Sequence, residues 1–153
     1  MKVAFFTGHR TVTSYHKANI NKLIDYALDQ GCNYFLSGMA LGTDTIAAQL
    51  LSERGLPWTA VIPFKGQEQR WQEVQKLEYK RLLALANKVI IIEPAYSKGV
   101  YEMRNDYMIR YSHLCLAVYA GKNGGTRNAV RKVVKRGMSL IVYCPITRQF
   151  HHR

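Results

Sequence analysis

Two glycine-bearing turns carry the residue types best suited to chemistry in this chain. The first is the segment 37–44, Ser-Gly-Met-Ala-Leu-Gly-Thr-Asp, and the second is the segment 121–126, Gly-Lys-Asn-Gly-Gly-Thr. Each follows an apolar run and leads into a segment with helical spacing. Glycine lets backbone N–H groups approach a ligand closely, and a helix start adds unpaired donors and a positive dipole end. The two turns therefore predict a site for a phosphate-bearing ligand, such as a nucleotide or a nucleotide derivative.

The first turn matches neither common phosphate-binding motif. Its glycines, Gly38 and Gly42, are not spaced as GxGxxG, and no GxxxxGK[ST] occurs in the chain. Thr43 or Asp44 is suited to cap the following helix, so a plain strand-to-helix connection is one interpretation. A carboxylate at a helix start disfavours a phosphate there, and Asp44 is instead suited to accept a hydrogen bond from a ribose hydroxyl. With Ser37, these residues form the first half of the expected ligand site.

The second turn gives the sharper signal. Gly124 and Gly125 are adjacent, and Thr126 is suited to be the N-cap of a following helix. The backbone N–H groups of such a turn form a compact nest for an anion. A flexible turn is the alternative interpretation. We assign Gly121, Gly124, Gly125 and Thr126 to the second half of the ligand site.

Two further segments supply polar side chains. Gly8, His9 and Arg10 close the first apolar run, where Arg10 could pair with a phosphate and His9 could donate or accept a proton. A surface arginine and a hydrogen-bonded loop histidine are the alternatives. Arg104, Asn105 and Asp106 lie in a segment of helical spacing, and salt bridging on the helix surface is their alternative role. Asn105 stands out because asparagine is a weak helix former. We add Gly8, His9, Arg10 and Asn105 to the expected ligand site.

Signals of catalysis are few. No Ser-His-Asp or Cys-His order stands out, and Asp44, Glu93 and Glu102 are the only acids near the expected strand ends or the loops beyond them. Asp44 and Glu102 are therefore weak candidates for an acid, a base or a nucleophile. Trp71 and Tyr79 are assigned to packing rather than to base stacking.

The composition is that of one globular domain spanning residues 1–153, with 48% apolar and 21% charged residues. The apolar run at the N-terminus is too short for a signal segment or a membrane span, so we expect a cytoplasmic protein without a membrane partner. Cys32, Cys115 and Cys144 are far apart and include no CxxC pair, and the five histidines are not spaced as metal ligands. We expect free thiols, no metal site and no resident cofactor beyond the nucleotide-like ligand.

The charge is strongly positive and uneven. The net charge is +12, from 22 Lys+Arg against 10 Asp+Glu, and residues 121–153 contain eight Lys or Arg and no acid. In the segment 129–136, Val130, Val133 and Val134 form an apolar stripe. The other face carries Arg131, Lys132, Lys135 and Arg136. A solvated helix face is one interpretation, and attraction to nucleic acid or to an anionic ligand is the other.

Short β-branched or aromatic runs alternate with helix-length amphipathic segments. We expect strands at Lys2–Thr7, Asn33–Ser37, Trp58–Pro63, Lys88–Glu93, Leu114–Ala120 and Ser139–Cys144. Helical spacing covers 20–28, 46–51, 67–86 and 101–111, with Trp71, Val74, Leu82 and Leu85 facing inward. This alternation predicts an α/β fold, a single doubly wound, mainly parallel Rossmann-like sheet with helices on both faces. Ligands bind beyond the carboxyl ends of such strands, where both glycine turns fall.

Together these residues resemble the SLOG superfamily, the Rossmann-like group that contains LOG-type phosphoribohydrolases and the DNA processing protein A. The likeness is nearest to its YpsA-like branch. It extends over most of the chain and rests on the order and spacing of short motifs at 7–10, 37–44, 67–79, 104–105 and 117–126.

The resemblance implies a pocket for a nucleotide-derived ligand, formed by the glycine turns together. LOG enzymes carry a PGGxGTxxE pattern whose glutamate, with an arginine, is associated with cleavage of the base–ribose bond. The matching stretch here, 122–130, keeps Gly124, Gly125 and Thr126 but lacks the proline and the glutamate. LOG-type hydrolysis is therefore not implied.

We interpret the chain as a protein that binds a nucleotide or nucleotide-derived ligand in a sensing or signalling role, and we expect it to form a homo-oligomer. One alternative is an N-glycosidic-bond hydrolase or transferase acting on nucleoside monophosphates or related ligands through Asp44 or Glu102. The other is a nucleic-acid-binding protein that uses the basic C-terminal region.

Overall fold

All six expected strands form, and they lie in a single sheet. The computed structural model describes residues 1–153. Its strands are β1 (Val3–Gly8), β2 (Tyr34–Ser37), β3 (Trp58–Phe64), β4 (Lys88–Glu93), β5 (Leu114–Val118), β6 (Ser139–Tyr143) and β7 (Phe150–His152). The order across the sheet is β4-β3-β2-β1-β5-β6-β7, and every neighbouring pair except β6 and β7 is parallel.

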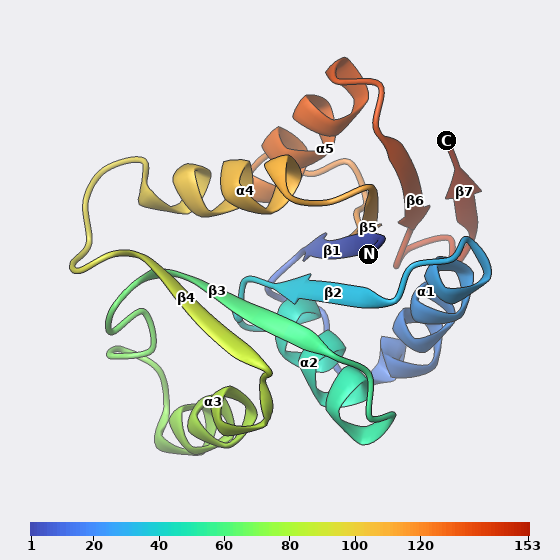
Figure 1. Ribbon diagram of the computed structural model, residues 1–153. Helices are drawn as coiled ribbons and strands as arrows, with labels where there is room; N and C mark the ends of the chain where they lie inside the picture. Colours follow the sequence, from blue (N-terminus) through green and yellow to red (C-terminus); the bar gives the residue numbers. More distant parts are fainter.

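Helices cover both faces of this sheet (Figure 1). They are the 3₁₀ helix η1 (Ser14–His16) and the α-helices α1 (Lys17–Asp29), α2 (Thr43–Glu53), α3 (Glu73–Leu85), α4 (Val100–Arg110) and α5 (Gly125–Lys135). Helices α1, α2 and α3 lie on one face, and α4 and α5 lie on the other. The fold is thus the doubly wound α/β arrangement that the sequence predicts.

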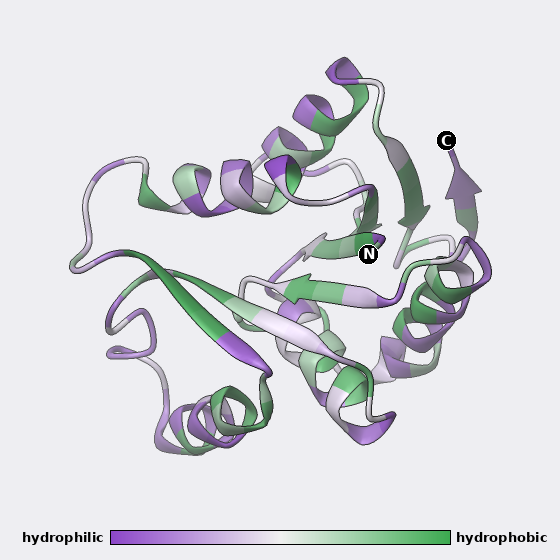
Figure 2. Cartoon of the chain, viewed as in Figure 1, coloured by the Kyte–Doolittle hydropathy of each residue, from purple (hydrophilic) through white to green (hydrophobic).

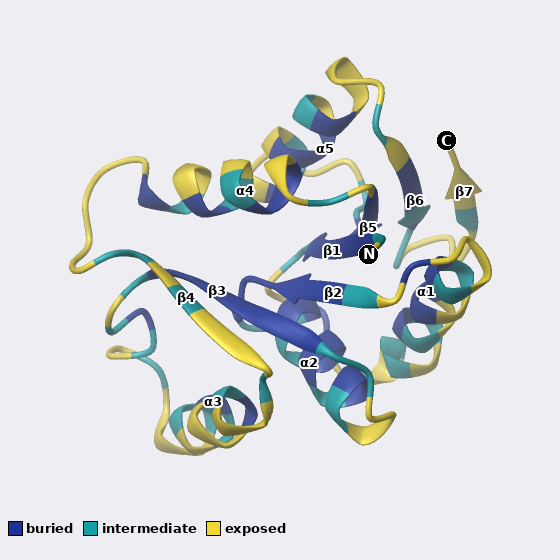
Figure 3. Cartoon of the chain, viewed as in Figure 1, coloured by how far each residue is buried: buried dark blue, intermediate teal, exposed yellow.

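Each face of the sheet has its own apolar core. Successive residues of a strand point to opposite faces, so Phe5 packs toward α4 and α5 while Phe6 packs toward α1 and α2. Strand β5 is therefore apolar and buried along its whole length, and β1 is so from Val3 to Phe6, as Figure 3 shows by the burial of the central strands. Figure 2 shows the hydropathy of the same strands. This two-sided burial explains why their sequences show continuous apolar runs instead of alternation.

The switch in strand order lies at β1. Strands β2, β3 and β4 follow it on one side, and β5 and β6 lie on the other. The register pairs Gly8 at the end of β1 with Val118 at the end of β5. Because the carboxyl ends of parallel strands meet at one edge, the turns after β1, β2 and β5 open beside one another.

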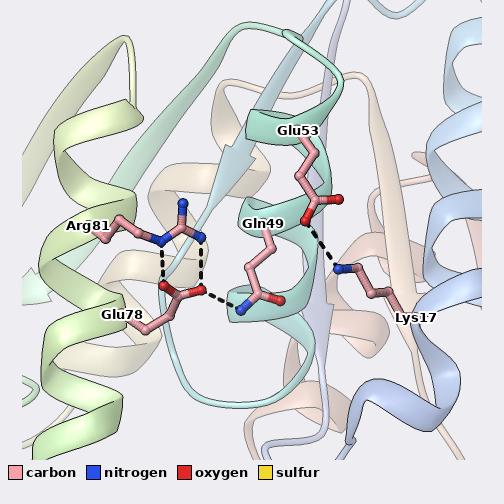
Figure 4. A network of polar contacts seen from close by, with 5 residues as sticks. All are labelled: Lys17, Gln49, Glu53, Glu78 and Arg81. Carbon is pink, nitrogen blue, oxygen red and sulfur yellow. Dashed lines mark hydrogen bonds and ion pairs between the residues drawn. The ribbon is translucent and has the colours of Figure 1, made fainter.

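A series of polar contacts joins the three helices on one face (Figure 4). Glu78 of α3 accepts hydrogen bonds from Arg81 on its own helix and from Gln49 of α2, the latter at 2.6 Å. Glu53 at the other end of α2 pairs with Lys17 of α1 at 3.2 Å. Helix α3 is thus fastened chiefly to α2.

Two strand features differ from the sequence prediction by more than one residue at a strand end. The chain has a seventh strand, β7, whose three residues are too few to show a periodic pattern. Strand β5 ends at Val118 instead of Ala120, because Ala120 donates its N–H to Nε2 of His9 at 2.9 Å and not to a strand carbonyl.

Several apolar positions predicted to face the core are exposed. Val74 and Leu85 of α3 have 77% and 50% of their surface exposed, and Val134 of α5 has 48%. Helix α3 begins at Glu73 and not at Gln67. It rests on α2 through its flank around Tyr79, so the opposite flank has no partner. The predicted inward positions of Val74 and Leu85 are therefore wrong. Of the predicted apolar stripe of α5, Val130 and Val133 are buried and Val134 is exposed.

The cysteines differ in their surroundings. Cys32 and Cys115 are buried free thiols, as predicted, whereas Cys144 is only partly buried. Burial raises the pKa of the Cys115 thiol, so this side chain behaves as a small apolar residue. No group of three or more His, Cys, Asp or Glu side chains is arranged to hold a metal ion. No helix is both long and apolar enough to cross a membrane.

Candidate functional site

A cavity of about 360 Å³ opens at the carboxyl edge of the sheet, beside the end of β1. Four segments line it: the end of β1 with its turn, the first glycine turn, helix α4 and the second glycine turn. The lining residues are Phe6, Thr7, Gly8, His9, Arg10, Ala40, Asp44, Tyr101, Arg104, Asn105, Met108, Asn123, Gly124, Gly125 and Thr126.

The fold brings most of the expected ligand residues to this cavity. Those that line it are Gly8, His9, Arg10, Asp44, Asn105, Gly124, Gly125 and Thr126. Ser37, Gly38, Gly42 and Gly121 are not among the lining residues. The two glycine turns therefore border one cavity. The first turn contributes Ala40 and Asp44 to the lining, whereas Gly38 and Gly42 lie outside it.

The first glycine turn interlocks with the turn after β1. Gly42 is the N-cap of α2 with a φ of +77°, and a Cβ there would lie 2.5 Å from the carbonyl oxygen of Arg10. Thr43 does not cap the helix, because its hydroxyl donates to the carbonyl oxygen of His9 at 3.1 Å. A Cβ on Gly8 would overlap the Thr43 side chain. The absence of side chains at positions 8 and 42 is what lets these segments meet.

Asp44 presents an unused acceptor. Its carboxylate is buried at 6% exposure, and Oδ2 accepts the N–H of Ala40 at 3.2 Å. Oδ1 has no hydrogen-bond partner. Burial raises the pKa of Asp44, and the nearby Arg104 guanidinium and the Ala40 N–H act in the opposite direction. A buried acceptor without a donor is rare in folded proteins and marks a place where a ligand donor would be stabilised.

Arg104 is a site residue that the sequence analysis did not assign to the ligand site, although it belongs to the 104–105 motif. Its guanidinium is buried at 5% exposure and donates from Nη1 to the carbonyl oxygen of Gly38 at 2.7 Å and from Nε to Oδ1 of Asn105 at 2.8 Å. A Cβ on Gly38 would overlap it. In the sequence, Arg104 lies four residues from each of the apolar residues Val100 and Met108, and this spacing was the signal that could have placed it on the buried side of the helix.

His9 holds a neutral imidazole beside the cavity. Its Nε2 accepts the N–H of Ala120, which leaves the proton on Nδ1. Burial and the positive charge of Lys122 lower its pKa below the ordinary value. His9 therefore contributes a neutral hydrogen-bonding ring rather than a positive charge.

The ring of Tyr101 orients two guanidinium groups. Arg10 lies over this ring at 5.0 Å, and Arg104 lies 5.9 Å from the same ring centre. Phe64 packs edge-on against Tyr101, and Tyr96 lies tilted beside it, so the ring is held in place by two further aromatic side chains. Cation–π contacts of this kind orient a guanidinium without neutralising it. This wall of the cavity is accordingly positive.

The second glycine turn ends in the start of α5. Gly124 is the N-cap with a φ of +138° and makes no side-chain cap bond, so the predicted capping role of Thr126 is wrong. The first N–H groups of an α-helix have no partner within the helix. Asn123 accepts a hydrogen bond from the Arg127 side chain, which fastens the turn to α5. Unpaired N–H groups thus border the same cavity as the two arginines.

Glu102 lies outside the cavity. It is exposed and pairs with Lys132 of α5 at 2.5 Å, and Lys132 also pairs with Asp106 at 2.6 Å. Asp44 is therefore the only carboxylate among the lining residues. Any acid–base or nucleophilic chemistry by a carboxylate in this cavity would depend on Asp44 alone.

A buried polar group supports the first turn from the side of α3. Gln67 donates from Nε2 to the carbonyl oxygen of Gly38 and to the hydroxyl of Tyr79, both at 3.2 Å. Burial raises the pKa of Tyr79 to about 12. Trp71 packs edge-on against Tyr79 with ring centres 5.2 Å apart. Trp71 and Tyr79 are packing residues, as predicted.

A doubly wound, mainly parallel sheet with a cavity at the switch in strand order defines the Rossmann-like class of α/β proteins. Within this class the chain belongs to the SLOG family. The family model YpsA, described as the YspA SLOG family, matches residues 1–143.

Two relatives illustrate the sequence similarity. The chain is 34% identical over 118 residues to the uncharacterized SPbeta prophage-derived protein YoqJ of Bacillus subtilis (strain 168), covering 66% of this chain and 69% of YoqJ. It is 25% identical over 132 residues to a UPF0398 protein of Bacillus pumilus (strain SAFR-032), covering 82% of this chain and 71% of the relative.

Solved structures share the fold at lower identity. DNA processing protein A of Streptococcus pneumoniae superposes with a TM-score of 0.70 and 18% identity over 92% of this chain, which spans 49% of that protein. The molybdenum cofactor binding protein of Rippkaea orientalis superposes with a TM-score of 0.61 and 14% identity, covering 92% of this chain and 75% of that one. Similarity at this level establishes the fold.

Proposed function

We propose that the cavity binds a nucleotide or nucleotide-derived ligand and that the protein acts as a binding or sensing protein. The observation that carries this proposal is the meeting of opposite ligand-binding features in one cavity. The start of α5 supplies unpaired N–H groups, and Arg10 and Arg104 supply positive charge, while Oδ1 of Asp44 supplies a free acceptor. This combination suits a ligand that carries an anionic group at one end and hydroxyl or N–H donors at the other.

Each part of the ligand has a proposed partner. The N–H groups of Gly124, Gly125 and Thr126 and the guanidinium of Arg10 would hold the phosphate. Asp44 would accept from a ribose hydroxyl or a base N–H. The side-chain oxygen of Asn105 accepts from Arg104, and its NH₂ group would donate to the ligand. Among the structural neighbours, one binds the molybdenum cofactor and another, from Helicobacter pylori, binds single-stranded DNA.

Calorimetric titration of the 153-residue protein with AMP, GMP, NAD and ADP-ribose tests the proposal, with inorganic phosphate as the simplest anion. We expect one of the nucleotides to bind more tightly than phosphate. Arg10→Gln should weaken it about 10- to 100-fold, the loss of one charge-assisted hydrogen bond. Arg110→Gln, an exposed arginine on α4, is the matched control. Equal affinity of the Arg10→Gln and control variants, or no nucleotide binding at millimolar concentration, would contradict the proposal.

The alternative of glycosidic-bond hydrolysis is tested on the same ligands. Chromatography after long incubation at high protein concentration would detect free base. We expect none, because the second turn lacks the glutamate of the LOG pattern and Glu102 faces Lys132. Base release that disappears in Asp44→Asn would replace binding by catalysis as the function.

A second candidate function rests on the exposed basic face of α5. Arg131, Lys135 and Arg136 are exposed and form no ion pair, whereas Lys132 is neutralised by two acids. Such a face attracts nucleic acid through phosphate contacts. Fluorescence anisotropy with a single-stranded oligonucleotide should show affinity that falls with salt. Neutralising the three residues should reduce the salt slope by about one for each side chain that binds a phosphate. Lys80→Gln on α3 is the control. An affinity that does not change with salt, or that is unaffected by the three substitutions, would exclude this function.

A further inference from the structure

Strand β4 is an open and apolar edge of the sheet. It is the outermost strand, and no element pairs with its outer side. Val89 and Ile91 have 41% and 49% of their surface exposed, so the same strand is coloured as hydrophobic in Figure 2 and as exposed in Figure 3. Edge strands are normally protected by short length, a central charge, a proline or a bulge. Charges stand only at the two ends of β4, Lys88 and Glu93.

The opposite edge of the sheet is protected in the usual ways. Strand β7 has three residues, and two of them are the exposed histidines His151 and His152. The contrast makes β4 the edge that the fold leaves available. Helix α3 does not cover it, because α3 is fastened to α2.

The backbone of β4 defines which groups are free. Asn87 donates its N–H to Trp58 of β3, and the carbonyl oxygen of Glu93 accepts from Lys65 after β3. Because backbone groups alternate along a parallel strand, odd-numbered residues of β4 face β3. The N–H and C=O groups of Lys88, Ile90 and Ile92 therefore point to the open edge.

We propose that two copies of this chain pair antiparallel through β4, about a two-fold axis at Ile90. In this register Ile90 lies opposite the partner's Ile90, and Lys88 lies opposite the partner's Ile92. Each outward N–H and C=O of one copy then meets an outward group of the other. The two seven-stranded sheets join into one continuous sheet.

The side chains of β4 are complementary to themselves in this register. Val89 of each copy lies opposite the partner's Ile91, so the exposed aliphatic side chains of both strands cover one another on one face. No like charges face one another, because Lys88 lies opposite the partner's Ile92 and Glu93 lies opposite the partner's Asn87. A register shifted by one residue would place outward groups opposite inward ones. The partner that best fits this edge is therefore β4 of a second copy of the chain.

Sedimentation velocity over a range of protein concentrations tests the proposal, and we expect a reversible dimer. Ile90→Pro removes an outward N–H without removing any hydrogen bond to β3, so the variant should fold and sediment as a monomer. Ile91→Lys places a charge in the proposed interface and should also give a monomer. Val74→Lys, at a more exposed apolar position on α3, is the matched control and should dimerise like the wild type.

Cross-linking tests the register itself. In a Cys144→Ser background, Ile90→Cys should cross-link to its own copy in the partner with a short thiol-reactive reagent. Ile92→Cys should not, because two such residues would be separated by about four residues along the strands, roughly 13 Å.

The outcomes separate the proposal from its rivals. If the protein remains monomeric at every concentration, β4 does not pair with a second copy and the proposal is overturned. The edge would then be open to a strand of another protein. A dimer that survives both Ile90→Pro and Ile91→Lys forms through another surface and overturns it too. If circular dichroism shows that Ile90→Pro is unfolded, Ile91→Lys and the cross-linking pattern decide.

Discussion

At the scale of single residues, His9 connects the ends of two strands. Its Nε2 accepts the N–H of Ala120, which fixes the start of the loop that leads to the second glycine turn. A protonated ring could not accept this bond. Burial and the nearby charge of Lys122 lower the pKa of His9, so the ring stays in the neutral form that the bond requires.

We therefore predict a specific pH dependence of stability. Because the folded-state pKa of His9 lies below its ordinary value of 6.5, its contribution is present above that pH and is lost as the pH falls through the folded-state pKa. The difference in unfolding free energy between wild type and His9→Gln should shrink as the pH falls from neutral to acidic. Urea unfolding at several pH values measures it, with the exposed His151→Gln as control. If the unfolding free energies of wild type and His9→Gln changed in parallel with pH, the ring would not be held in its neutral form.

Arg104 gives a second prediction at the residue scale. Its removal would take away the larger of the two arginine charges acting on Asp44 and one hydrogen-bond donor to the Gly38 carbonyl. Leaving buried hydrogen-bonding groups without a partner costs about 1–3 kcal/mol. Arg104→Ala should lower the unfolding free energy by that amount in urea titrations, whereas the exposed Arg110→Ala on the same helix should change it by less than about 0.5 kcal/mol. A small loss of unfolding free energy in Arg104→Ala would show that the folded chain does not depend on this buried arginine.

At the scale of elements, the close approach of the β1 turn and the α2 start depends on Gly42. A Cβ at this position faces backbone atoms, which cannot rotate away, and the residue has a positive φ. Gly42→Ala should cost about 2–5 kcal/mol, the sum of a left-handed backbone and overpacking. Gly55 also has a positive φ but nothing within 4 Å, so Gly55→Ala isolates the backbone cost at about 1–2 kcal/mol. Equal losses in the two variants, measured by urea unfolding, would refute the steric contact.

Most elements are predictable from the sequence because their signals are local. Buried parallel strands such as β1 and β5 are continuous apolar runs, and the turns after them carry glycine. The sequence predicts α3 too long because the segment around Gln67 has the right residue types, yet the Gln67 amide supports the first glycine turn. Strand β7 forms through pairing with β6, and nothing in its three residues indicates that pairing.

The candidate site is only partly predictable for a related reason. Gly124, Gly125 and Arg10 stand in recognisable turns, whereas Arg104 and Tyr101 reach the cavity from a helix that is distant in sequence. Their positions arise from packing between elements, which a single sequence does not specify. Likewise, the sequence suits Asp44 to a helix cap or a ribose acceptor, and its buried free oxygen becomes visible only in the fold.

At the scale of the whole molecule, the cavity joins the two halves of the sheet. Its lining comes from the turns after β1 and β2, from α4 and from the start of α5. The turn after β2 leads into α2 on one face of the sheet, and α4 and α5 lie on the other face. A ligand held by all four segments is bound only by the folded chain. Binding should therefore stabilise the domain as a unit, and not one turn alone.

This linkage gives a quantitative expectation for thermal unfolding. A ligand at about one hundred times its Kd adds about 2.7 kcal/mol to the unfolding free energy. For a domain of this size each kcal/mol raises Tm by about 2–4 °C, so the ligand should raise Tm by about 5–10 °C. Scanning calorimetry of wild type and Arg10→Gln at equal ligand concentration measures the shift. Arg10→Gln should show a smaller rise in proportion to its weaker binding, and an equal rise in both would place the ligand outside this cavity.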